Sequence, residues 1–107
     1  MTAGHRITVE RSDRPVRVVH GGEVLAESDQ ALVLRETGLP ARYYIPPKDV
    51  RLDLLAPSET RTHCPFKGTA SYWSRPDAPD LVWAYPDPKP DVADIKDHLC
   101  FYDVEVR

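Results

Sequence analysis

The sequence predicts a mainly β protein: a compact domain of short antiparallel strands with one or two short helices. Three observations predict this class. Apolar residues make up 41% and charged residues 29% of the chain, which is a globular composition. Most of the 11 prolines lie between positions 46 and 90, where they disfavour long helices. Short β-branched and aromatic runs alternate with turn residues. Because 107 residues suffice for one core, we expect a single domain over residues 1–107.

The first half of the chain predicts strands around a tight hairpin. Gly21 and Gly22 can adopt the positive φ angles of a two-residue turn between two apolar runs, residues 16–20 and 23–27. Proline suits the first helical position and Asp49 would lie near the positive end, so 47–52 predicts one helical turn. The other strands expected in this half cover residues 7–10, 31–36 and 42–45.

The second half predicts fewer strands and one short helix. Asp91 is a suitable N-cap for a helix over 92–98, and Val92, Ile95 and the following Leu99 have helical spacing. The remaining elements are a polar loop at 57–62, strands at 69–74 and 81–85 joined by a turn at 75–80, and a last strand at 101–106. Seven or eight strands suggest an antiparallel sheet folded on itself, or two packed sheets.

Charge and hydropathy exclude several classes of partner. The net charge of −3 disfavours binding to nucleic acid or to an anionic membrane, because both partners are negatively charged. No apolar run approaches the roughly 20 residues that cross a bilayer, and the N-terminus shows no signal peptide, so we expect a cytoplasmic protein. Two cysteines are too few for a disulfide framework, and both thiols are expected to be free. The sequence does not fix the oligomeric state.

Residues 63–68 hold the most distinctive side chains. A cysteine becomes reactive when a nearby positive charge stabilises its thiolate, and Lys67 follows Cys64 by three positions. Gly68 would let the backbone turn sharply or approach a ligand. The alternative, favoured by residue type alone, is that Cys64 is a small buried apolar residue and Lys67 a surface residue. A zinc site has the wrong ligand spacing, so no metal is expected.

Two further clusters have a functional and a structural interpretation. Tyr85 ends an aromatic strand before a proline-rich turn, and Tyr44 precedes Asp49 and Arg51. These tyrosines could line a pocket while Asp49 and Arg51 orient polar groups. Equally, the tyrosines could be core residues, and Asp49 could pair with Arg51 on the surface.

The runs GGEVLAES, YYIPPKDVRLDLL, THCPFKGTASYWS and VWAYPDPKP resemble a bacterial and fungal family of domains of unknown function. The family carries a nucleotidyltransferase-like label, and the resemblance covers about residues 16–102. It implies a β-tent-like fold. Its motif centres on the Cys64 stretch together with Tyr44, Asp49, Arg51, Tyr72 and Tyr85. Because of this resemblance, we give a binding or catalytic role of this stretch the same weight as a purely structural role.

Three functions follow as alternatives, and whether the protein is an enzyme is left open. The first is binding or catalysis of a small molecule, including a nucleotide-like one, in a pocket without a cofactor. Cys64 would be the nucleophile or thiol contact, and Lys67 would stabilise its thiolate or hold an anion. Tyr44, Tyr72 and Tyr85 would line the pocket, with Gly68, Asp49 and Arg51 also contacting the substrate. The second is a non-catalytic interaction module with a structural Cys64. The third is nucleotidyl transfer, for which neither a phosphate-binding loop nor metal-binding carboxylates are found in the sequence.

Overall fold

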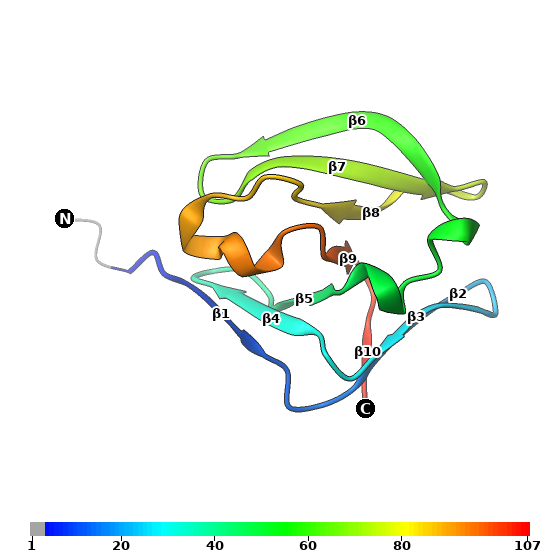
Figure 1. The fold of residues 1–107 in the computed structure, drawn as a ribbon, viewed down its shortest axis with the longest axis horizontal. Helices are drawn as coiled ribbons and strands as arrows, with labels where there is room; N and C mark the ends of the chain where they lie inside the picture. Colours follow the sequence, from blue (N-terminus) through cyan, green and yellow to red (C-terminus); the bar gives the residue numbers. More distant parts are fainter. Residues whose placement is uncertain (1–3) are drawn as a thin grey trace.

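The computed structural model describes residues 4–107, which form two antiparallel sheets and three short 3₁₀ helices (Figure 1). The strands are β1 (Ile7–Arg11), β2 (Val16–His20), β3 (Glu23–Ser28), β4 (Leu32–Glu36), β5 (Arg42–Ile45), β6 (Ala56–Cys64), β7 (Gly68–Arg75), β8 (Ala78–Ala84), β9 (Leu99–Phe101) and β10 (Glu105–Val106). The helices are η1 (Pro47–Asp49), η2 (Leu52–Leu54) and η3 (Pro90–Ile95). The predicted mainly β class with antiparallel sheets and few short helices is therefore confirmed.

The larger sheet has seven strands in the order β1-β4-β5-β9-β8-β7-β6, and the smaller has the order β10-β2-β3. In Figure 1, β6, β7 and β8 lie on one side of the molecule and β1, β4 and β5 on the other. The hairpin β2–β3 forms as predicted, because Gly21 and Gly22 adopt φ angles of 57° and 79°. No helix among the described residues has the length and apolar character to cross a membrane.

Side chains alternate between two faces of the seven-stranded sheet, because successive residues of a strand point to opposite sides. The register places Tyr44 opposite Cys100, Cys100 opposite Trp83, and Trp83 opposite Tyr72. We call the face that carries this row the aromatic face. It is completed by Leu34, Ala70, Tyr85 and, from η3, Val92 and Ile95.

The opposite face, which we call the aliphatic face, carries the neighbouring residues of the same strands. Its buried members from β5, β8 and β9 are Ile45, Val82, Ala84, Leu99 and Phe101. They form one cluster with buried residues of the smaller sheet, Val16, Val18, Leu25 and Ala26, and with Val50 and Leu55. The smaller sheet therefore covers this face and closes it against water.

The predicted loop at 57–62 is wrong, because these residues belong to β6, which pairs with β7. β6 is an edge strand whose side chains are mostly exposed, so it lacks the apolar alternation that marks a buried strand. The Ser58 and Thr60 hydroxyls donate hydrogen bonds to the Asp80 carboxylate at 2.6 and 2.8 Å. Polar contacts thus stabilise β6, although its sequence lacks the alternating apolar residues by which a strand is usually recognised.

Three boundaries in the second half also differ from the predictions. η3 ends at Ile95 and begins after Lys89, with Asp91 inside its first turn and not at its N-cap. Backbone angles at Val92 (φ −126°, ψ 27°) interrupt the expected longer helix over 92–98. The single strand expected at 101–106 is two strands, β9 and β10, which pair in different sheets. The turn expected at 75–80 is shorter, because β8 begins at Ala78.

Candidate functional site

A cavity of about 210 Å³ lies on the aromatic face, where the smaller sheet does not cover it. Its walls come from β4, β5, β7, β8, the β4–β5 turn, the β6–β7 hairpin and the residue after β9. The lining residues are Leu34, Glu36, Leu39, Pro40, Arg42, Tyr44, Lys67, Tyr72, Trp83, Tyr85 and Tyr102. The site therefore combines a mostly aromatic surface with three charged side chains.

Lys67 reaches the cavity from the turn of the β6–β7 hairpin. Its backbone is held on both sides, because its N–H donates to the Cys64 carbonyl at 3.2 Å and its carbonyl accepts from the Lys89 N–H at 2.9 Å. The residue is only 8% exposed. Gly68 follows with φ 120°, and a Cβ there would lie 3.1 Å from the Asp87 carbonyl oxygen. This close approach of the 86–90 segment requires glycine and helps to direct Lys67 inward.

The Lys67 ammonium group is bound between a carboxylate and a thiol. Its Nζ donates to Glu36 Oε1 at 2.6 Å and lies 3.7 Å from Cys64 Sγ. The other Glu36 oxygen contacts His5 Nε2 at 2.9 Å, and the His5 ring stacks on Phe66 with 4.0 Å between centroids. Because the Glu36 side chain is only 7% exposed, this is a buried ion pair. Such a pair is stable only when both charges are present.

The pKa of the Glu36 carboxyl is lower than its ordinary value. Burial by itself opposes ionisation, but the hydrogen bonds from Lys67 and His5, together with their charges, outweigh it. The carboxylate therefore stays ionised at neutral pH and holds the Lys67 ammonium in place.

Aromatic rings form the opposite wall around an arginine. The Arg42 guanidinium carbon lies over the Trp83 ring at 5.5 Å and over the Tyr102 ring at 5.8 Å. Those two rings contact each other with centroids 4.7 Å apart. Tyr72 lies 6.5 Å from Trp83, and its hydroxyl is 2.8 Å from Thr62 Oγ1. These cation–π contacts thus restrict the position of the guanidinium group.

Two buried phenols, Tyr44 and Tyr85, complete the floor with centroids 6.5 Å apart. Burial raises the pKa of Tyr44, and the neighbouring Cys100 adds to the effect. Burial likewise raises the pKa of Tyr85, with a contribution from Cys64. Both phenols remain protonated at neutral pH, so they can donate hydrogen bonds but do not act as anions.

The two cysteines are free and differ in their surroundings. Cys100 is fully buried, and this burial raises the pKa of its thiol to about 12. Cys64 is partly buried at the end of β6 and packs against the aromatic face. It contacts Lys67 but is absent from the residues that line the cavity.

The structure brings together some of the sequence-predicted site residues and separates others. Lys67, Tyr44, Tyr72 and Tyr85 line one cavity, with Cys64 behind Lys67. Gly68 lies outside it, in an open groove shared with His63, Thr69 and the 86–90 segment.

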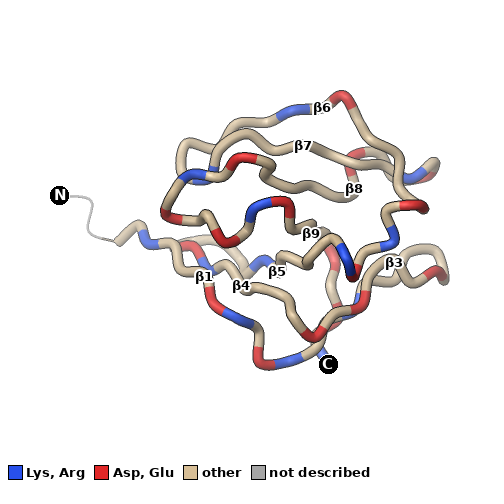
Figure 2. The backbone as a smooth tube through the Cα atoms, in the orientation of Figure 1, with Lys and Arg blue, Asp and Glu red and all other residues tan. Residues whose placement is uncertain are grey.

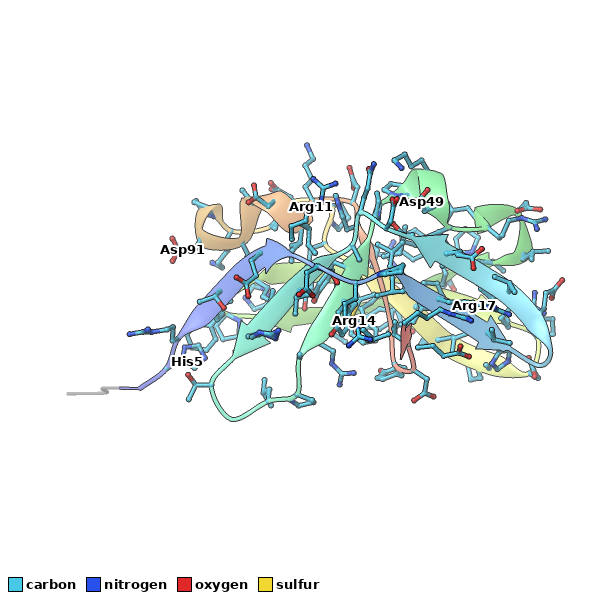
Figure 3. The ribbon with its side chains drawn as sticks, turned by 90° about the horizontal axis from the view of Figure 1, so that it is seen from below. His5, Arg11, Arg14, Arg17, Asp49 and Asp91 are labelled. Carbon is cyan, nitrogen blue, oxygen red and sulfur yellow. The ribbon has the colours of Figure 1, made fainter. Side chains whose placement is uncertain are left out.

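Asp49 and Arg51 lie elsewhere. Asp49 accepts a hydrogen bond from Ser28 at 2.7 Å, and Arg51 pairs with Asp53 through two hydrogen bonds of 2.9 and 3.0 Å. Figure 3 shows Asp49 well separated from His5, which contacts the site through Glu36. Neither Asp49 nor Arg51 lines the cavity on the aromatic face.

Sequence reasoning missed Glu36, Arg42, Trp83 and Tyr102 as site residues. Glu36 and Arg42 flank the β4–β5 turn, two positions from Leu34 and Tyr44, so alternation places them on the aromatic face. That alternation is a signal in the sequence. It becomes informative only when the strand order shows which other strands share the face.

Charged positions are interspersed along the backbone of residues 4–107, and Figure 2 shows no continuous basic segment among them. Within residues 4–107, no group of three or more His, Cys, Asp and Glu side chains lies close enough to hold a metal ion. Glu36 is the single carboxylate among the residues that line the cavity, and Lys67 and His5 already occupy its two oxygens. The cavity therefore does not fit the carboxylate and water ligands that Mg²⁺ prefers.

Fold and cavity together define a small antiparallel β protein with a concave, partly charged site. A family model described as a domain of unknown function (DUF427), with the label NTP_transf_9, matches residues 8–107. The chain belongs to this family, which confirms the resemblance predicted from its motifs. No curated protein matches the chain.

Proposed function

We propose that this protein binds a small molecule in the cavity on the aromatic face. The observation that carries the proposal is the Lys67 ammonium group, held by Glu36 in the wall of an otherwise mostly aromatic cavity. Buried ion pairs are expensive to desolvate and are often neutral or unfavourable for stability compared with apolar residues. A buried ion pair beside a concave site with a few polar groups is typical of ligand binding.

The contacts leave binding capacity in the cavity. An ammonium group carries three N–H donors, of which one reaches Glu36 and another points at the weak acceptor Cys64 Sγ. The neutral hydroxyl of Tyr85 adds a donor, and Trp83 and Tyr72 provide flat apolar surface. A ligand would therefore meet both hydrogen-bond donors and flat ring surfaces in the site.

The cavity volume limits the size of the ligand. About 210 Å³ is below the roughly 300–1,000 Å³ of pockets that enclose drug-sized molecules. A nucleoside triphosphate would extend beyond this space. The family label makes nucleotidyl transfer a further candidate, and titration with nucleoside triphosphates and Mg²⁺ tests it directly. Binding alone would also agree with the proposed small-molecule site, whereas the absence of any binding up to millimolar concentration would exclude nucleotidyl transfer.

Small probes of different charge test the proposed function by NMR. We expect at least one of benzamide, benzoate, benzylamine and their aliphatic counterparts to shift amide signals of β5 and β8. Such a probe should bind with a Kd of about 1 mM, as expected for a molecule of this size. The double variant Glu36→Gln, Lys67→Met removes both charges together and should weaken binding, whereas Lys96→Met, at an exposed lysine, should not. If no probe shifts cavity signals, the proposed function is wrong.

Thiol chemistry at Cys64 is a second candidate, favoured by the 3.7 Å contact between its Sγ and Lys67 Nζ. Glu36 competes for the same ammonium charge at 2.6 Å, which weakens the support for a thiolate. Iodoacetamide labelling measures the effect, and the fully buried Cys100 is an unreactive internal reference. If Cys64 is activated, Glu36→Gln should speed its alkylation because the lysine charge is then free. Equal rates in both proteins would contradict this candidate.

Cys64→Ser separates catalysis from plain binding. If Cys64 is structural, as in a non-catalytic interaction module, the variant should retain ligand binding with the fold intact. If Cys64 is the nucleophile, the variant should bind ligand and lose turnover.

A further inference from the structure

We propose that the ligand of the cavity is a small planar carboxylate held by Arg42. This inference rests on the proposed small-molecule binding and adds the chemical class of the ligand. It follows from the charge balance of the cavity, the orientation of the guanidinium group and the shape of the remaining walls.

The charged residues of the cavity do not balance. Lys67 is neutralised by Glu36 at 2.6 Å. Among the ion pairs within 4.0 Å and the hydrogen bonds of arginine side chains in residues 4–107, none involves the Arg42 guanidinium. Two cationic side chains and one carboxylate in the lining leave one positive charge. Because Arg42 is partly buried, water hydrates its guanidinium group only in part. A bound anion would supply the hydrogen-bond acceptors that this group lacks.

The orientation of Arg42 favours a planar anionic group. Its guanidinium carbon lies 5.5 Å from the Trp83 ring centroid and 5.8 Å from the Tyr102 centroid, and these centroids are 4.7 Å apart, so both rings lie on one side of the group and leave its other side open. The N–H donors project from its edges, and their fork matches the two oxygens of a carboxylate. Contacts with two rings restrict the side chain before the ligand arrives, which reduces the entropy lost on binding.

The walls beside Arg42 favour a flat ring attached to that carboxylate. Trp83, Tyr72 and Tyr85 present aromatic surface to the cavity, and Leu34 adds an aliphatic side chain to the lining. Aromatic groups gain from offset or edge-to-face contacts with such rings. A volume of about 210 Å³ suits one ring with a short substituent.

One surplus positive charge favours a carboxylate over a phosphate ester. A carboxylate carries one negative charge at neutral pH, which the site balances. A phosphate monoester carries about −1.5 to −2 at pH 7 and would leave excess negative charge beside Glu36. Phosphate therefore serves as the contrasting arm of the test.

Calorimetric titration with four probes tests the ligand class. The probes are benzoate, its neutral analogue benzamide, the non-planar cyclohexanecarboxylate, and phenyl phosphate. We expect benzoate to bind about tenfold more tightly than benzamide, the difference that one charge-assisted hydrogen-bonded pair contributes. Cyclohexanecarboxylate and phenyl phosphate should both bind more weakly than benzoate.

Variants at Arg42 assign the effect to that residue. Arg42→Gln should reduce benzoate affinity about tenfold, to the level of benzamide. Arg42→Lys should recover only part of the loss, because an ammonium group lacks the planar fork. The matched control Arg11→Gln removes the same charge from an exposed position of β1 and should leave benzoate affinity unchanged. Melting temperatures confirm that each variant is folded.

Each adverse result has a distinct meaning. Equal affinity of benzoate and benzamide, or an unaffected Arg42→Gln variant, overturns the carboxylate assignment while small-molecule binding in the cavity stands. Tighter binding of phenyl phosphate than benzoate also overturns it, in favour of a phosphate ligand. Failure of all four probes and of the wider probe set overturns both this assignment and the proposed function.

Discussion

The two faces of the seven-stranded sheet are built from the same strands and differ in almost every property. Ile45, Val82 and Leu99 point to the aliphatic face, while their neighbours Tyr44, Trp83 and Cys100 point to the aromatic face. The smaller sheet packs on the aliphatic face. The aromatic face is covered in part by η3 and keeps a cavity that contains a buried ion pair.

This difference suggests that one face contributes mainly to stability and the other to ligand binding. Close packing of branched aliphatic side chains gives a core with few voids, in which each lost methylene group is costly. Rings and charged groups pack less completely, and the space they leave is accessible to a ligand. We therefore expect the most stabilising contacts on the face opposite the candidate site.

The largest expected effect is on the aliphatic face. Phe101 is 1% exposed, so Phe101→Ala should lower the free energy of unfolding by about 3–5 kcal/mol. Tyr72→Ala, in the cavity wall, should cost much less because this tyrosine is only partly buried. Chemical denaturation measures both. A larger loss for Tyr72→Ala than for Phe101→Ala would break the division between the faces.

The buried ion pair should give the next largest effect. Glu36→Gln leaves the Lys67 ammonium without its carboxylate and should destabilise the protein by about 3 kcal/mol. Adding Lys67→Met should restore much of this loss, because both charges are then removed. Denaturation of the two single variants and the double variant forms a thermodynamic cycle. Additive losses in that cycle would contradict direct coupling between the two residues.

The smallest effect concerns pH. Because the pKa of Glu36 is lowered in the folded state, the unfolded chain binds more protons below the ordinary value of 4.5. The stability from this carboxylate is thus present above pH 4.5 and lost as pH falls through the lower folded pKa. Glu36→Gln should flatten the acid limb of the stability profile. The exposed control Glu59→Gln should retain the wild-type slope, and an identical slope in Glu36→Gln would contradict the assignment.

Much of the local structure could be predicted because it depends on neighbours in the chain. The Gly21-Gly22 turn and the strands on both sides follow from backbone freedom and β-branched residues. The edge strand β6 could not be recognised, since its exposed polar residues look like a loop. The last segment was predicted as one strand because nothing local indicates that β9 and β10 join different sheets.

The candidate site was predictable in part for the same reason. Lys67 and the tyrosines were found by residue type and motif, and four of the predicted residues line the cavity. Asp49 and Arg51 were grouped with Tyr44 by closeness in sequence, but η1 and the following residues carry them away from its cavity. Glu36 could not be recognised as a site residue from the sequence, because its ion-pair partner Lys67 lies 31 positions away.

The amino-acid sequence by itself determined the β class and the family, and it singled out Lys67 and three tyrosines that line the cavity. Propensity, turn chemistry and motif spacing are properties of a few adjacent residues, so they can be read without the fold. Only the tertiary structure decided that Lys67 meets Glu36 and that Arg42 lies over Trp83 and Tyr102. These contacts depend on the order of strands in the sheet, which brings distant residues onto one face.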